Sequence, residues 1–91
     1  MRESLDEALK VIANHYGKDE QLHQLMEECC ELAMEANHSY RKNSLTINLI
    51  NEIADVEIMI AQIKYLFGIE EKDIDEAKEM KINRQLNRMG N

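Results

Sequence analysis

Apolar side chains are most concentrated between Leu45 and Phe67, and their spacing predicts a helix that is packed on several sides. Placed at about 100° per residue, they point in nearly every direction, which is typical of a helix with neighbours on more than one face. Two acids, Glu52 and Asp55, interrupt this stretch. Because a carboxylate among aliphatic neighbours costs several kcal/mol unless it is paired, both residues need either water or a cation.

The periodicity along the rest of the chain predicts an all-α fold. Glycine is a common stop for a helix, and Gly17, Gly68 and Gly90 each follow an apolar periodic run. The joins are short, which favours a bundle-like single domain over residues 1–91. The predicted helices are 4–16, 19–41, 45–67 and 71–88.

Composition agrees with this fold and indicates self-association. The chain has no proline and three glycines in 91 residues. A chain of this size hides only about 60 to 65% of its unfolded surface, so its own core is thin. A helix that is apolar all round therefore predicts a homodimer or homotetramer, in which other copies complete the packing.

Charge and hydropathy exclude several partners. The formal net charge of −7 argues against binding of duplex nucleic acid, which needs a basic surface. No uncharged run approaches membrane length and the first ten residues carry charges throughout, so we expect a soluble, cytoplasmic protein. Cys29 and Cys30 are adjacent on a predicted helix and diverge by about 100°, which predicts two small buried side chains rather than a disulfide.

Two pairs of acids form the candidate site. Glu28 and Glu31 are three residues apart on one predicted helix, and Glu52 and Asp55 repeat this spacing on the next. If the two helices lie side by side, four carboxylates come together and destabilise the fold unless cations neutralise them. Oxygen ligands without histidine or cysteine favour Mg²⁺, with Mn²⁺ as the alternative.

Other interpretations of these acids remain open. Each pair alone is a weak signal, since glutamate is common on solvated faces and forms surface ion pairs. The acids could instead form the partner surface of a non-catalytic helical interaction module. A di-iron bundle is less favoured, because it normally places a histidine three residues after a glutamate, where this chain has Glu31 and Asp55.

The two motifs together resemble the ExxE and ExxD signature of the MazG-like all-α nucleoside triphosphate pyrophosphohydrolases. Twenty residues separate the two motifs, Glu28-Cys29-Cys30-Glu31 and Glu52-Ile53-Ala54-Asp55. The resemblance covers residues 16–88, although the chain lacks the tryptophan-containing segment of longer members.

The resemblance implies an activity. Glu28, Glu31, Glu52 and Asp55 would hold Mg²⁺, and a water would attack the α-phosphorus of a (deoxy)nucleoside triphosphate. The products would be the monophosphate and pyrophosphate, and the role would be removal of unwanted or surplus nucleotides.

The remaining candidates would contact the substrate. Lys81, Arg84 and Arg88 lie on one stripe of the fourth predicted helix, and the resemblance implies that such residues bind phosphates. The alternative is that they complement the helix dipole and pair with acids. Polar side chains on or near the site faces are candidates for base recognition, although most such residues are simply solvated: Gln21, Gln24 and Asn51.

Overall fold

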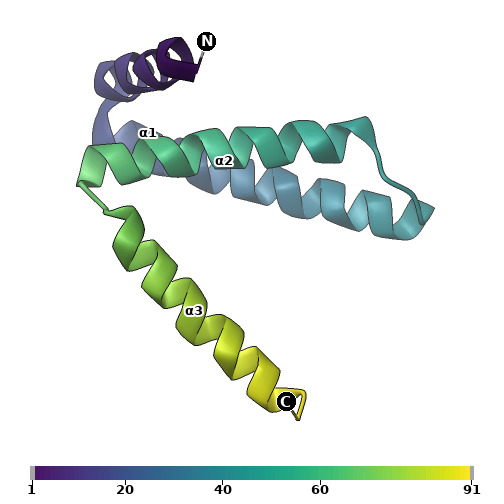
Figure 1. The fold of residues 1–91 in the computed structure, drawn as a ribbon. Helices are drawn as coiled ribbons and strands as arrows, with labels where there is room; N and C mark the ends of the chain where they lie inside the picture. The colour runs from purple at the N-terminus through teal and green to yellow at the C-terminus, as the bar shows by residue number, and fades with distance from the viewer. Residues whose placement is uncertain (1, 91) are drawn as a thin grey trace.

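The computed structural model describes residues 2–90, and it is all-helical (Figure 1). No strand occurs in this described range. The predicted all-α class is therefore confirmed, and the last two predicted helices agree with the structure to within two residues. The three helices are α1 (Arg2–Lys42), α2 (Ile47–Phe67) and α3 (Glu71–Arg88).

The first two predicted helices are joined into α1, so the structure has three helices where the pattern predicts four. Gly17 interrupts α1 as a kink with φ 86° and ψ 175°. This backbone conformation is open to glycine and strained for residues with a Cβ, which explains why glycine occupies the kink. Helical geometry resumes at once after Gly17, and the predicted break is therefore a bend rather than a loop.

Both ends of α2 are capped. The hydroxyl of Thr46 accepts a hydrogen bond of 3.1 Å from the backbone N–H of Leu49, and the helix therefore begins two residues later than predicted. At the other end Gly68 adopts the left-handed conformation at φ 65°. The N–H of Ile69 then donates to the carbonyl of Lys64 at 2.9 Å, which closes the last turn.

The core lies between α1 and α2. The part of α1 after the kink runs antiparallel to α2, and the part before the kink crosses the end of α2 (Figure 1). Asn14 Nδ2 donates to the hydroxyl of Tyr65 at 2.8 Å, and this exposed hydrogen bond links the two helices at the crossing. The buried residues are few, and two of them are polar: Ala13, Gln21, Val56, Met59 and Gln62.

Helix α3 leaves this hairpin and extends away from it (Figure 1). Within residues 2–90, α1 and α2 are the only helices packed against each other. Lys64 and Glu71 form an ion pair across the elbow between α2 and α3. A four-helix bundle is therefore not confirmed in the single chain.

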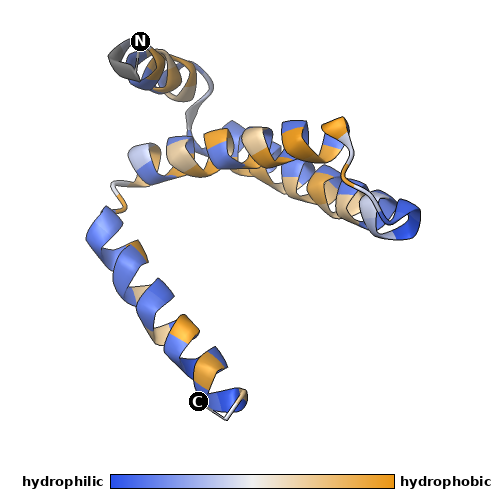
Figure 2. Ribbon diagram, turned by 45° about the vertical axis from the view of Figure 1, so that its right-hand side comes forward, coloured by the Kyte–Doolittle hydropathy of each residue, from blue (hydrophilic) through white to orange (hydrophobic). Residues whose placement is uncertain are grey.

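Much apolar surface stays uncovered. Hydrophobic positions line α2 and recur along α3, where they alternate with polar residues (Figure 2). Cys29 and Cys30 are both exposed, contrary to the prediction, because α2 alone packs against α1 in the described chain and leaves most of its surface uncovered. No helix of the described chain is long and apolar enough to cross a membrane.

Candidate functional site

The two acidic motifs face each other across the seam between α1 and α2. One carboxylate oxygen from each of Glu28, Glu31 and Glu52 lies within 4.8 Å of the others. Glu28 and Glu52 are half-buried, whereas Glu31 is exposed. The structure therefore brings together three of the four predicted acids in one cluster, from both helices.

The fourth acid, Asp55, lies beside Glu28. The pKa of Glu28 is raised to about 6, first by burial and then by the hydrogen bond that its protonated carboxyl donates to the neighbouring Asp55. The pKa of Glu52 is also raised, first by burial and then by the charge of Glu31. The carboxylates therefore repel one another in the absence of a cation.

The register of the two helices explains this pairing. Glu28 lies seven positions after Gln21 on α1, and Gln62 lies seven positions after Asp55 on α2, which is about two helical turns on each. Gln21 donates its amide to Gln62 across the seam. Because the helices are antiparallel, this pair sets Glu28 opposite Asp55 and, one turn further, Glu31 opposite Glu52.

Two oxygens of the cluster are buried without a hydrogen-bond partner. These are Oε2 of Glu52 and Oε2 of Glu35, neither of which finds a donor among the described residues. His38 Nδ1 is 3.7 Å from the Glu35 oxygen, which is too far for a hydrogen bond. A buried carboxylate oxygen without a donor is costly, so the cluster has unused capacity to bind a cation.

A recess opens at these oxygens. It has a volume of about 190 Å³ and is lined by Glu31, Met34, Glu35 and Glu52. Glu35 is one turn beyond Glu31 on the same face of α1, which gives the cluster a fifth acid. In the sequence, the spacing of four residues between Glu31 and Glu35 indicates that the two acids share one face of the helix.

A groove of about 380 Å³ lies further along the same seam. It begins one helical turn from Glu28 and Asp55, and both polar and apolar side chains line it. Gln21 and Gln24, which the sequence analysis gives as candidates for substrate contact, line this groove. Ile58 forms part of its apolar wall. The lining residues are Ile12, Tyr16, Glu20, Gln21, Gln24, Ile58, Met59 and Gln62.

The sequence pattern does not predict the contribution of the first part of α1 to this groove. Ile12 and Tyr16 reach it because the kink at Gly17 folds the start of α1 over the end of α2. A local pattern carries no signal for this contact, since the direction of a kink depends on packing. Asn51, the third predicted polar contact, is exposed on α2 and lines neither the groove nor the recess.

The predicted basic residues do not meet the acids within one chain. Lys81, Arg84 and Arg88 are exposed on α3, which packs against neither helix of the hairpin in the described range. Among the residues described, no lysine or arginine lines the recess or the groove. In this conformation, the basic residues of α3 therefore cannot bind phosphates at the acids of their own chain.

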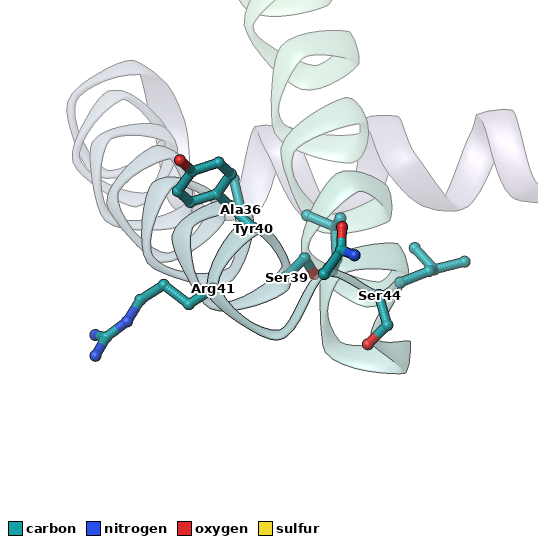
Figure 3. A pocket seen from close by; sticks show the side chains of 8 residues that line it. Ala36, Ser39, Tyr40, Arg41 and Ser44 are labelled. Atoms are coloured by element: carbon teal, nitrogen blue, oxygen red, sulfur yellow. The ribbon is translucent and has the colours of Figure 1, made fainter.

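A hollow larger than the recess and the groove lies elsewhere, at the turn between α1 and α2. It is a shallow depression of about 770 Å³ that contains none of the predicted site residues. Arg41 points away from Ser39 and Ser44 there (Figure 3). It holds no cluster of acids, so the recess and the groove are the better candidates for a functional site.

Comparison with known proteins adds no assignment. No family model matches the chain, and no curated protein or solved structure matches it either.

Proposed function

We propose that the chain is a Mg²⁺-dependent nucleotide pyrophosphohydrolase that cleaves a (deoxy)nucleoside triphosphate to the monophosphate and pyrophosphate. The observation that carries the proposal is the clustering of Glu28, Glu31 and Glu52, with Asp55 adjacent, around a buried oxygen that lacks a donor. The resemblance of the two motifs to the MazG-like signature supports the same activity.

The residues of the cluster suit the metal. All of them are carboxylates, which are the ligands that Mg²⁺ prefers, with Mn²⁺ as a substitute. Glu28, Glu31, Glu52 and Asp55 would hold it. The chemistry that Mg²⁺ supplies when bound is neutralisation of triphosphate charge and activation of a water for attack on the α-phosphorus. In this reaction the new bond joins the water oxygen to the α-phosphorus, and pyrophosphate leaves.

The groove suits the nucleoside. It adjoins the acids, so a triphosphate held at the cluster would place its base among Tyr16, Gln24 and Ile58. The apolar walls would cover the faces of the base, and the amide of Gln24 would bond to its edge.

The proposed enzyme is a homodimer or homotetramer, because so much apolar surface is exposed in one chain. Since nucleoside triphosphates are its substrates, we place the activity in the cytoplasm.

The test is a panel of common and damaged triphosphates incubated with the protein and Mg²⁺. Release of pyrophosphate is expected, whereas release of single phosphate would contradict the proposed bond cleavage. We expect Glu52→Gln to lower the rate by at least about 100-fold while circular dichroism still shows a helical fold. Its matched control is Glu27→Gln, which makes the same change at an exposed position outside the cluster and should retain activity.

A non-catalytic interaction module is the second candidate, and the extensive exposed apolar surface favours it. Thermal unfolding separates the two. A metal that binds only the native state raises the midpoint, so Mg²⁺ should raise it for the enzyme. If Mg²⁺ neither raises the midpoint nor supports hydrolysis, the interaction module is preferred.

A further inference from the structure

Glu35 is the acid of the cluster that neither of the two motifs includes. It lies four residues after Glu31 on the same face of α1, and it lines the recess together with Glu31 and Glu52. Its side chain is 23% exposed, and its Oε2 is buried without a hydrogen-bond donor among the described residues. A buried carboxylate oxygen that stays unpaired is costly, so this side chain needs a partner.

The side chains around the recess do not supply the missing donor. His38 is three residues further along α1, but its Nδ1 is 3.7 Å from the Glu35 oxygen and its side chain is 48% exposed. The other residues in the lining are Met34 and the carboxylates of Glu31 and Glu52, and none of these has a hydrogen to donate when the acids are ionised. Since the oxygen is buried, its donor must come with a ligand that binds in the recess.

The position of Glu35 distinguishes it from the acids that converge on one point. The three carboxylate oxygens that lie within 4.8 Å of one another belong to Glu28, Glu31 and Glu52. Glu35 lines the recess beside them, whose volume is about 190 Å³. One water needs about 10 to 15 Å³ of such volume, and Mg²⁺ keeps several of its waters when a protein binds it. The recess therefore has room for the waters of a cation held by the three converging acids.

We propose that Glu35 is a positioning residue of the metal site, and that its buried oxygen accepts a hydrogen bond from a water of the bound cation instead of ligating the cation. This inference rests on the proposed function, because the cation is the Mg²⁺ assigned there. The hydrogen bond orients the water shell on the side of the recess, as outer-shell partners do at other metal sites. It also gives the buried oxygen of Glu35 the donor that the hairpin does not provide.

Binding of Mn²⁺ tests this role without any hydrolysis. Mn²⁺ is a paramagnetic substitute for Mg²⁺ at oxygen sites, and electron paramagnetic resonance measures the free ion. Glu35→Leu removes the acceptor and should raise the dissociation constant for Mn²⁺ by at least about 10-fold, as the loss of an outer-shell partner does elsewhere. Circular dichroism in EDTA checks that the variant keeps its helices. A dissociation constant equal to that of the wild type would overturn the proposal.

A second variant, Glu35→Gln, separates the hydrogen bond from the charge and keeps the shape of the side chain. The amide oxygen of glutamine still accepts a hydrogen bond, although the side chain is neutral. Glu35→Gln should therefore bind Mn²⁺ at least about 3-fold more tightly than Glu35→Leu, and more tightly than Glu52→Gln. Equal losses in the two Glu35 variants would show that charge alone acts there. A loss in Glu35→Gln as large as in Glu52→Gln would make Glu35 a direct ligand, and either result would overturn the proposal.

Two matched variants control for charge and for the neighbouring histidine. Glu27→Leu makes the same change at an exposed position of α1 outside the cluster, and His38→Ala removes the side chain next to Glu35. Both variants should bind Mn²⁺ as the wild type does. A loss in Glu27→Leu equal to that in Glu35→Leu would mean that net charge accounts for the effect. The same loss in His38→Ala would assign the effect to the histidine, and each of these results would contradict the proposal.

Hydrolysis by the wild-type protein separates this inference from the proposed function. If the wild type hydrolyses triphosphates and binds Mn²⁺, but Glu35→Leu binds Mn²⁺ equally well, only the role of Glu35 is wrong. If the Glu35 variants weaken Mn²⁺ binding as expected and the wild type hydrolyses no member of the triphosphate panel, only the proposed function is wrong. A wild-type protein that does not bind Mn²⁺ would refute both.

Discussion

At the scale of single residues, the clustered carboxylates differ from ordinary surface acids in their protonation. Burial and the neighbouring Asp55 raise the pKa of Glu28 to about 6, from an ordinary value of 4.5. Gln21 and Gln62, two turns away, are buried but satisfy each other by a hydrogen bond. The same seam therefore contains one satisfied polar pair and one strained group of acids, and only the acids respond to pH.

Glu28 should make the metal-free protein less stable as pH rises from 4.5 to about 6. In this window the native carboxyl keeps a proton that the unfolded chain has released, so the native state binds more protons and rising pH favours unfolding. Urea unfolding in EDTA should show this fall in wild-type protein relative to Glu28→Gln. A constant difference between the two proteins across the window would contradict the raised pKa.

At the scale of helices, the sequence predicts the pairing of the motifs better than the ends of the elements. The spacing of three residues within each motif placed Glu28 and Glu31 on one face and Glu52 and Asp55 on another, and the structure brings these faces together. Helix α2 begins two residues later than predicted because Thr46 provides the cap, although Ser44, two residues earlier, is a cap residue of the same kind. Both residues are suitable caps, so local sequence could not decide between them.

A single substitution can test the kink in α1 directly. Gly17→Ala places a Cβ on a backbone with φ 86°, and this should lower the free energy of unfolding by about 1 to 3 kcal/mol. Urea unfolding measures the loss. Gly90→Ala is the matched control, since φ is 89° there but the residue lies beyond α3 and can relax. Equal losses in both variants would show that the kink has no special role.

At the scale of the whole molecule, the tertiary arrangement is where prediction from sequence ends. The pattern predicted that α2 is packed on several sides, yet its outer isoleucines are 40 to 47% exposed in one chain. Likewise Cys29 and Cys30 were predicted to be buried, but they are exposed. Hydrophobic periodicity indicates that a helix face packs against another surface. It does not indicate whether that surface belongs to the same chain or to another copy.

The outer face of α2 should control assembly. Ile53→Glu places a charge on an apolar surface that a second copy would cover in the proposed oligomer, and burying an unpaired charge is costly, so the dissociation constant should rise at least about 100-fold. Sedimentation over a concentration series measures this change. Val11→Glu is the control, since Val11 is 67% exposed but lies on α1 rather than on this face of α2. An unchanged dissociation constant for Ile53→Glu would exclude this face as the interface.

The hairpin formed by α1 and α2 has one evolutionary consequence. All four predicted acids lie between Glu28 and Asp55, on a single uninterrupted stretch of chain. One recombination event could therefore move the complete set of acids into another gene, and their register would travel with them. The basic residues of α3 lie outside this stretch and would not be needed to keep the acids in register.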